Sequence, residues 1–252
     1  MSGAKDWKMF PFPAKLTWRQ TVSFWLRDQL IRRRLRSSAT PISRLFDGLP
    51  DPGTPRRILV TGLDCAGKTE LLRKCFSQDV TQPGGGDVVT YILTIGMCVE
   101  QVSYGSVTVY AYDVGGCSPG GLRRLARKMV AEADAVVWVV DSIDWERMVE
   151  SREEFDRFLC HEGEEFGPDK PLLFLSNKSD SPQSKGLEQV QRHFGDVLER
   201  MNSHVAETAI PTGDGLLEAF GWLSDQLQGN QNQEMKQKTS TSTIMLPEAE
   251  KS

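Results

Sequence analysis

The amino-acid sequence predicts an α/β fold with a mostly parallel, six-stranded sheet and helices on both of its faces. The first observation is that apolar runs rich in Val, Leu and Ile alternate along the chain with stretches of helical periodicity. Unbroken apolar runs are typical of strands buried on both faces, and intervening helices are typical of parallel crossovers. The second observation is Gly105-Ser106, which joins two alternating segments and predicts one antiparallel hairpin.

The predicted elements follow one another in a regular order. Apolar or alternating runs predict strands at 56–61, 98–104, 107–114, 133–141, 170–178 and 205–210. Helical spacing of apolar residues predicts helices at 67–76, 146–159, 186–201 and 215–227.

Composition narrows the class of protein. The chain has 252 residues, 39% of them hydrophobic and 25% charged, as expected for a globular protein. Its net charge of −4 argues against a general nucleic-acid binder. The five cysteines show no CxxC pairing, so neither a disulfide framework nor a zinc site is supported. We therefore expect a reducing, cytoplasmic location.

The sequence divides into three regions. Residues 1–50 carry ten basic and three acidic side chains, and a Pro/Gly/Asp-rich hinge, DGLPDPGTP, follows at 47–55. We expect a basic N-terminal arm with an amphipathic helix at 1–54 and a folded domain at 55–228. The polar segment 229–252 shows little periodicity and is expected to be a disordered tail.

The segment 62–69, GLDCAGKT, follows the first predicted strand and opens the first predicted helix. It matches G-x-x-x-x-G-K-[ST], in which glycines let successive backbone N–H groups surround a phosphate. The Lys68 ammonium can reach the outer phosphates, and the Thr69 hydroxyl can bind Mg²⁺. The pattern predicts a phosphate site; a glycine-rich turn after a core strand is the alternative.

A second motif, Asn177-Lys178-Ser179-Asp180, lies at the end of the run 170–178. An amide at the first position and a carboxylate at the fourth can together bind the edge of a guanine, whereas adenine lacks the N–H groups that the carboxylate would accept. Binding sites in open α/β sheets lie at the carboxyl ends of the strands, so this tetrad and the phosphate loop are expected at one edge. Asn and Asp also form ordinary turns, but beside a phosphate loop the tetrad favours a guanine nucleotide.

The stretch YDVGGC completes the predicted site. Asp113 ends a strand beside the phosphate loop, where a carboxylate can hold Mg²⁺ through a water. Gly115 and Gly116 allow the chain to pass close to a terminal phosphate. Thr94 is predicted to complete the magnesium shell when a γ-phosphate is present.

These motifs resemble those of the Arf and Arf-like small GTPases. GLDCAGKT, TIGMCVE, YDVGGC, VVDSIDWER, NKSD and TGDGLLEAFGWLSDQL occur in the family's order and approximate spacing, over roughly residues 56–228. The resemblance implies a P-loop small-GTPase fold and a switch that binds GTP or GDP with Mg²⁺. Two loops, around 78–97 and 115–130, would reorder with the γ-phosphate. Effector proteins and exchange or activating factors are the implied partners.

The resemblance also implies a role for each site residue. Gly116 would sense the γ-phosphate, and Thr69, Thr94 and Asp113 would hold the metal, Asp113 through water. Ile210 stands where the family has a small residue against guanine, which implies a tighter base pocket. The implied nucleotide-binding residues are Gly62, Asp64, Cys65, Ala66, Gly67, Lys68, Thr69, Glu70, Gly116, Asn177, Lys178, Asp180 and Ile210.

Cys117 is the main departure from the family. Members that hydrolyse GTP carry a glutamine at this position to orient the attacking water. A thiol is a weak hydrogen-bonding group, so we expect a slow or partner-dependent GTPase at most and assign no catalytic residue. A redox switch at Cys117, or a neutral loop residue in an enzyme that uses another group, are the alternatives.

Two other departures bear on the protein partners. The segment 78–93 resembles an insertion, and Met97 replaces a usual phenylalanine, so partners of ordinary family members are not expected to bind in the same way.

In the N-terminal arm, aromatic and aliphatic residues interleave with arginines over 15–36, a composition that suits a reversible peripheral contact with anionic membranes. Packing of this arm on the domain, or on a partner protein, is the alternative.

Three functions follow from these observations. The first is a GTP-binding switch in membrane trafficking or organelle or cilium organisation. The second is a GTP-binding scaffold that does not hydrolyse its nucleotide. The third, a P-loop kinase or ATPase, is disfavoured by NKSD and DVGG.

Overall fold

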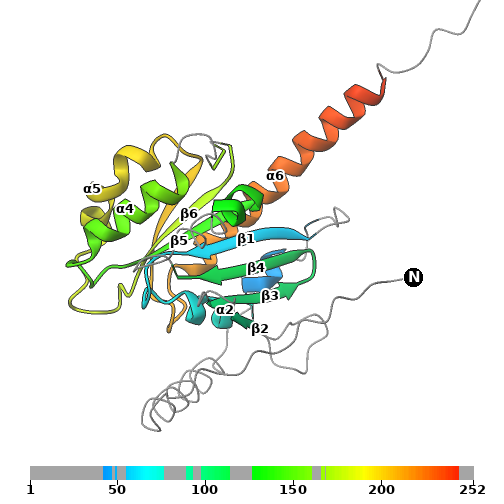
Figure 1. The fold of residues 1–252 in the computed structure, drawn as a ribbon. Coiled ribbons are helices and arrows are strands. Elements are labelled where there is room, and N and C mark those ends of the chain that lie inside the picture. The colour runs from blue at the N-terminus through cyan, green and yellow to red at the C-terminus, as the bar shows by residue number, and fades with distance from the viewer. Residues whose placement is uncertain are drawn as a thin grey trace, which may run out of the picture. The chain divides into compact units, whose positions relative to one another are not determined.

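The computed structural model describes residues 42–46, 49, 55–76, 89–92, 98–113, 127–160, 166–167 and 169–243. They contain a seven-stranded sheet of order β2-β3-β4-β1-β5-β6-β7 (Figure 1). The strands are β1 (Arg56–Thr61), β2 (Val89–Ile92), β3 (Cys98–Tyr104), β4 (Val107–Tyr112), β5 (Ala135–Asp141), β6 (Leu172–Asn177) and β7 (Ser203–Thr208). The helices are η1 (Ile42–Phe46), α2 (Lys68–Cys75), α4 (Met148–Leu159), α5 (Leu187–Leu198) and α6 (Leu216–Thr243), and residues 127–132 are also helical.

The sheet is parallel except at one edge. Strands β4, β1, β5, β6 and β7 pair in parallel, and β2 and β3 extend the sheet in antiparallel pairing. The predicted fold class, a mostly parallel sheet with helices on both faces, is confirmed. The sheet has one strand more than the six predicted. The additional strand is β2, within the segment that the sequence analysis described as an insertion.

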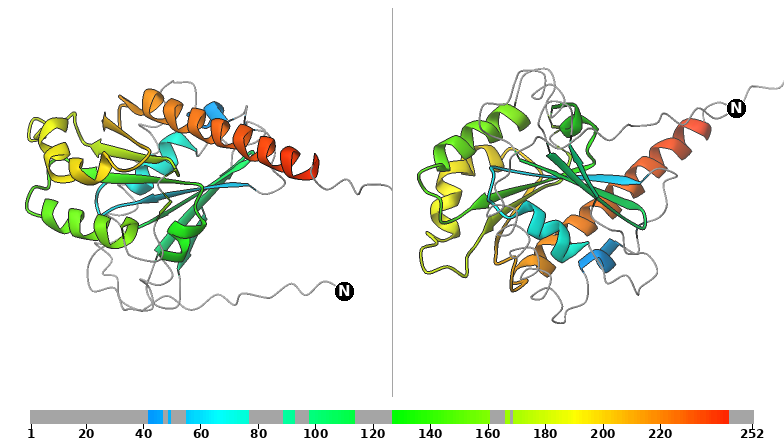
Figure 2. Two further views of the ribbon diagram at one scale, coloured as in Figure 1. Left: turned by 90° about the horizontal axis from the view of Figure 1, so that it is seen from above. Right: turned by 60° about the horizontal axis from the view of Figure 1, so that its bottom comes forward.

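Alternate residues of each central strand enter two separate cores. In β1, Ile58 and Val60 pack with α2 and α6, whereas Leu59 faces the opposite core with α4 and α5. In β5, Trp138 lies in the α4 core and makes an edge-to-face contact with Phe155 at 5.0 Å between centroids. Figure 2 shows the sheet with α6 and η1 on one side and α4 on the other. The period-two alternation is the geometric result of the pleat.

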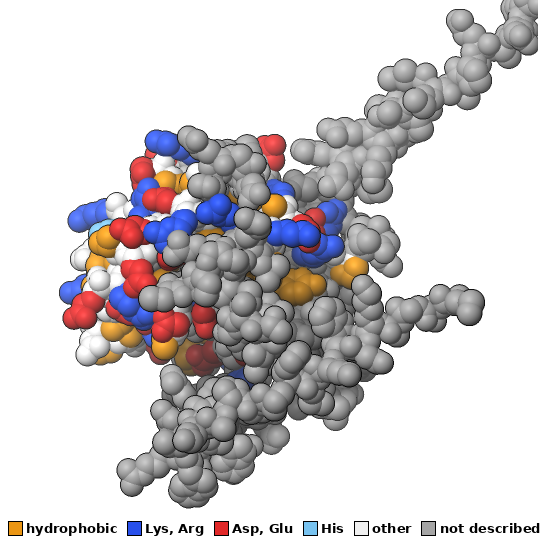
Figure 3. All heavy atoms as spheres, in the orientation of Figure 1, with side chains coloured by type: hydrophobic (Ala, Val, Ile, Leu, Met, Phe, Trp, Pro, Cys, Tyr) orange, Lys and Arg blue, Asp and Glu red, His pale blue; other side chains and the backbone are white. Residues whose placement is uncertain are grey.

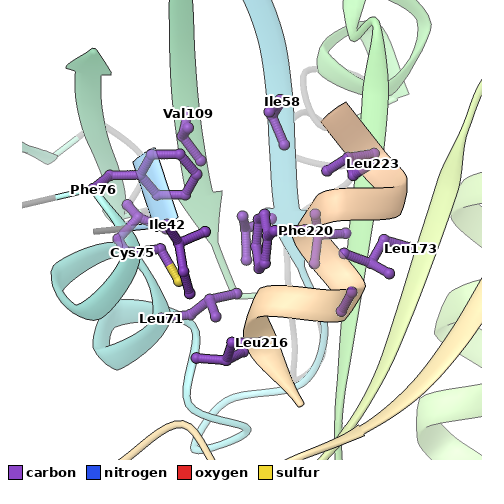
Figure 4. Packing of buried hydrophobic residues seen from close by; sticks show 14 of the residues in the cluster. Ile42, Ile58, Leu71, Cys75, Phe76, Val109, Leu173, Leu216, Phe220 and Leu223 are labelled. Atoms are coloured by element: carbon purple, nitrogen blue, oxygen red, sulfur yellow. The ribbon is translucent and has the colours of Figure 1, made fainter. Parts of the chain in front are cut away.

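The segment η1 belongs to the α2–α6 core, so the folded domain begins earlier than residue 55. Phe46 is 2% exposed and lies 5.8 Å from Phe76 and 6.4 Å from Phe220 between ring centroids. Ser224 of α6 donates its hydroxyl to the Leu45 carbonyl oxygen at 2.7 Å. Figure 4 shows Ile42 of η1 among Cys75, Phe76 and other residues of this core. The sequence placed 42–49 in the arm and hinge because five residues are too few to show a helical period.

Helix α6 extends beyond the predicted 215–227 and continues to Thr243, where the sequence predicted a disordered tail from residue 229. Its first turns are anchored in the core by Leu216, Phe220 and Leu223. The residues from 229 onward mix helix formers such as Gln, Glu, Met and Lys with Gly, Asn, Ser and Thr and show no apolar period, so the sequence contains no signal for this extension. In the described part of the chain, no helix combines the length and hydropathy that a membrane crossing needs.

Candidate functional site

The predicted site residues follow strands that end along one edge of the sheet. Strand β1 leads into the loop 62–67, β4 into Asp113, and β5 and β6 end at Asp141 and Asn177. The register of the sheet pairs Asp141 with Asn177 and Asn177 with Thr208. Because these strands are parallel, their following loops meet at the carboxyl edge, where open α/β sheets bind ligands.

The backbone of the phosphate loop adopts conformations that favour glycine. Gly62 and Gly67 have φ values of 140° and 109°, and Cys65 has a φ of 61°. A Cβ on Gly62 would lie 2.2 Å from the Val139 carbonyl oxygen, and one on Gly67 would lie 2.6 Å from Asn177 Nδ2. The loop therefore packs directly on the ends of β5 and β6. Helix α2, which follows, has no side-chain cap, so its first N–H groups can bind an anion.

Lys68 lies beneath this loop with its side chain only 3% exposed. Its Nζ donates to the Gly62 carbonyl oxygen at 2.9 Å and to that of Leu63, and it forms an ion pair with Asp113 Oδ1 at 2.5 Å. Burial lowers the pKa of Lys68, and the charge of Asp113 opposes that shift. Lys68 is thus paired with Asp113, the carboxylate predicted to lie beside the metal. When a polyphosphate binds with its cation, phosphate can take the place of Asp113 as the partner of Lys68, and the cation can take the place of Lys68 as the partner of Asp113.

The described oxygen donors at the loop suit a magnesium ion. Thr69 is partly exposed in the first turn of α2, and the Asp113 side chain is 63% exposed beside Lys68. Hydroxyl and carboxylate oxygens are the ligands that Mg²⁺ prefers. Thr94, Gly116 and Cys117 lie outside the described residues. Among the residues that the structure does describe, no group of three His, Cys, Asp or Glu side chains forms a separate metal site.

Asn177 connects the phosphate loop to the segment after β7. Its side chain is buried; Nδ2 donates to the Ala66 carbonyl oxygen at 2.8 Å, and Oδ1 accepts from the Ile210 N–H at 3.2 Å. Ile210 is fully buried, and its Cδ1 lies 3.3 Å from where a Cβ on Gly67 would stand. The side chain expected against the base is therefore packed in the core, against the loop glycine.

The other three members of the tetrad, Lys178, Ser179 and Asp180, lie nearer the surface. Lys178 has a φ of 69°, and its Nζ forms an ion pair with Asp141. The N–H of Ser179 donates to the Thr208 carbonyl oxygen at 3.1 Å, which ties the tetrad to β7. Asp180 is exposed, so a ligand at this edge can reach its carboxylate.

Two functional contacts involve residues to which the sequence analysis gave no role. Asp141 pairs with Lys178, and Arg147 donates to Asp64 of the phosphate loop at 2.5 Å. The sequence did contain a signal for Asp141, because an aspartate at the carboxyl end of a predicted parallel strand lies at the edge where ligands bind. Arg147 and Asp64 are 83 positions apart, and no local pattern pairs them.

Charge on the described surface is mixed. Figure 3 shows acidic and basic side chains interspersed over the described part of this face. Among the described residues, many charged side chains are paired, as in Arg152 with Asp156 and Asp196. The described part of this face therefore offers no broad basic area of the kind that binds nucleic acid.

Comparisons with known proteins agree with this geometry. A family model described as the ADP-ribosylation factor family matches residues 42–227. Among solved structures, the chain is similar to an ADP-ribosylation factor-like GTP-binding protein, also described as the small COPII coat GTPase SAR1, from Encephalitozoon cuniculi in complex with GDP. The two share 22% sequence identity and a TM-score of 0.59, over 87% of this chain and 98% of that chain. The likeness shows the fold, and the family match, which begins at η1 and covers most of the chain, shows that this protein belongs to the ADP-ribosylation factor family.

Proposed function

We propose that this chain is a guanine-nucleotide switch that binds GTP or GDP with Mg²⁺ at the carboxyl edge of its sheet. The observation that carries the proposal is the direct connection between the phosphate loop and the NKSD tetrad, made by the hydrogen bond from Asn177 to Ala66. This contact ties the phosphate loop to the first residue of the tetrad, which supports a site in which one nucleotide meets both motifs. The similar solved structure held GDP.

Each part of the nucleotide meets a different part of the chain in this proposal. The loop 62–69 surrounds the phosphates with N–H groups, and Lys68 balances their charge. Thr69 would hold Mg²⁺ directly and Asp113 would hold it through water. Thr94 and Gly116, which lie outside the described residues, are predicted from the family resemblance to meet the metal and the γ-phosphate. When bound, the metal offsets the charge of the outer phosphates. Asn177, Lys178 and Asp180 receive the base.

A binding assay on the purified full-length chain tests the nucleotide. We expect a fluorescent GTP or GDP analogue to bind with a Kd of about 1 µM or tighter, and ATP to leave it in place at large excess. Asp180→Ala is the matched variant, because its side chain is exposed and its loss should leave the fold intact. That variant should lose guanine affinity by at least about tenfold. Preferential binding of ATP would exclude a guanine-nucleotide switch.

Weak hydrolysis is the second part of the proposal and rests on Cys117. In single-turnover assays we expect Cys117→Gln to hydrolyse GTP at least about tenfold faster than wild type, because a carboxamide can orient water and a thiol cannot. Cys117→Ser is the control and should remain slow. Equal rates for the wild type and the glutamine variant would contradict this assignment. If neither hydrolyses GTP, the non-hydrolysing scaffold is the better description.

The cellular role that we propose is regulation at intracellular membranes, in trafficking or in organelle or cilium organisation. Membership of the ADP-ribosylation factor family supports this role. The arginine and tryptophan residues of the arm at 15–36 support a peripheral, reversible membrane contact. Effectors and exchange or activating factors are the proposed protein partners. Vesicle flotation of the full chain, compared with a chain that lacks residues 1–38 and keeps η1, tests the membrane contact.

A further inference from the structure

A carboxylate stands inside the phosphate loop, and an arginine from another element binds it. Asp64 is the third residue of GLDCAGKT, and its side chain is 60% exposed. Arg147, the residue before α4, donates from Nη1 to Asp64 Oδ1 at 2.5 Å. The same guanidinium binds Asp144 through Nε at 2.7 Å and Nη2 at 2.6 Å. Arg147 therefore joins the phosphate loop to the start of α4.

The remaining face of the arginine is held by its own turn. The backbone N–H of Arg147 donates to Asp144 Oδ1 at 3.3 Å, so main chain and side chain both bind this aspartate. A planar guanidinium held at two points has little freedom to turn away. Asp144 therefore orients Arg147, and Arg147 in turn orients Asp64.

The charge of Asp64 follows from the same contact. Burial alone would raise the pKa of Asp64, but the hydrogen bond and the positive charge of Arg147 outweigh it and lower that pKa. The carboxylate is therefore ionised at neutral pH. An ionised carboxylate in a loop whose N–H groups serve a polyphosphate would repel the ligand. Because the Asp64 side chain is 60% exposed, salt screens part of this repulsion.

The neighbouring groups show where an unrestrained Asp64 could turn. The start of α2 carries no side-chain cap, so N–H groups are available at the loop. An aspartate is among the side chains that bind such groups most readily. The charge of Lys68 also lowers the pKa of Asp64, but the Lys68 ammonium is paired with Asp113. Among the described residues, Arg147 forms the ion pair with Asp64.

We propose that Arg147 is a positioning residue of the phosphate site, which holds the Asp64 carboxylate toward α4 and neutralises it so that the loop can accept a polyphosphate. The proposal rests on the proposed function, since it assigns Arg147 a part in the same site. Without Arg147, the carboxylate carries an unbalanced charge and can take the N–H groups that a phosphate needs.

The test compares Arg147→Ala with a matched change at Arg152, which lies in α4, the helix that begins directly after Arg147. Arg152 binds Asp156 and Asp196 and has a side chain 22% exposed, against 34% for Arg147. Arg152→Ala therefore removes an equivalent set of ion pairs without touching the loop. Affinities for GTP, GDP and inorganic tripolyphosphate are measured for the full-length wild type and each variant, with the melting temperature as a check of folding.

We expect Arg147→Ala to bind GTP about tenfold more weakly, which corresponds to about 1.4 kcal/mol. The loss should be smaller for GDP, which has less charge, and should shrink when salt is raised from about 0.05 to about 0.5 M. The double variant Arg147→Ala with Asp64→Asn should return to within about twofold of wild type, because the carboxamide carries no charge. Arg152→Ala should bind all three probes as wild type does.

Each outcome decides the proposal. If Arg147→Ala binds as wild type, if Arg152→Ala loses as much affinity, or if the Asn replacement restores nothing, Arg147 is a structural residue only. Tripolyphosphate separates this result from failure of the proposed function, because it tests the loop without the base. A wild type that binds tripolyphosphate and no guanine nucleotide overturns the proposed function alone. A wild type that binds neither overturns both.

Discussion

Deleting residues 1–54 is expected to lower the free energy of unfolding by about 4–6 kcal/mol, whereas deleting residues 1–38 should leave it nearly unchanged. The longer deletion removes three apolar side chains, Ile42, Phe46 and Leu49, which are 8%, 2% and 6% exposed. Burial of one such side chain contributes about 1.5–3 kcal/mol. The sum for three is reduced because the unfolded chain already buries part of this surface. The shorter deletion ends before Ile42, the first residue that the structure describes, and it keeps η1.

Thermal and urea unfolding measure the difference. For a domain of this size the longer deletion should lower the melting temperature by about 10–20 °C. Phe46→Ala in the full chain should cost about 3–5 kcal/mol, since Phe46 contacts Phe76 and Phe220. Leu217→Ala is its control, because Leu217 is 58% exposed and should change stability by less than about 0.5 kcal/mol. Equal melting temperatures for the two deletions would show that η1 is not part of the core.

The shorter deletion is also the right comparison for the membrane proposal. It removes the basic arm at 15–36 and retains Ile42, Phe46 and Leu49 in the core. In flotation with anionic vesicles, we expect the full-length chain to be recovered with lipid and the chain lacking 1–38 to remain behind. Because the core is intact, the loss would report on the arm and not on unfolding. Equal recovery would exclude the membrane contact.

Elements long enough to show an apolar pattern could be predicted from the sequence, and the shortest elements could not. Strands such as β5 and β6 are unbroken apolar runs, which identify buried parallel strands. Segment η1 has five residues and β2 has four, too few for a period to appear. Their positions depend on partners distant in the chain, such as Phe220 for η1 and β3 for β2. Helix α6 continues beyond its apolar pattern, over residues that include Gly, Asn, Ser and Thr, whose composition does not predict a helix.

The candidate site, like the fold, could be predicted from the sequence only in part. The phosphate loop and the NKSD tetrad are each contiguous, so the sequence contains their whole pattern, and the order of strands brings them to one edge. The contacts that join them are not contiguous. Asn177 reaches Ala66 across 111 positions and Arg147 reaches Asp64 across 83. A single sequence predicts which side chains reach the edge but not which of them bind one another.

Asn177→Ala is expected to affect stability and both ends of the nucleotide site together. The replacement leaves the Ala66 carbonyl oxygen and the Ile210 N–H without the partner they have in the buried wild-type site. An unsatisfied buried group costs about 1–3 kcal/mol, so we expect a loss of about 2–4 kcal/mol in the free energy of unfolding. Asn202→Ala is the control. Asn202 directly precedes β7, at the opposite end of the strands, and is partly exposed. Its side-chain amide donates to the Asp169 carbonyl oxygen and to Gln226 Oε1.

The nucleotide affinities separate a residue that orders the loop from one that only reads the base. Asn177 holds the Ala66 carbonyl in place. Asn177→Ala should therefore lower the affinity for inorganic tripolyphosphate about tenfold and the affinity for GTP about a hundredfold, which corresponds to about 1.4 and about 2.7 kcal/mol. Asp180→Ala should weaken GTP alone, since Asp180 is exposed at the far end of the tetrad. Asn177→Asp keeps an acceptor for the Ile210 N–H but turns a carboxylate oxygen toward the Ala66 carbonyl, so it should be at least as damaging as alanine. If Asn177→Ala leaves tripolyphosphate binding unchanged, the phosphate loop is ordered without the tetrad, and the two motifs act on the nucleotide independently.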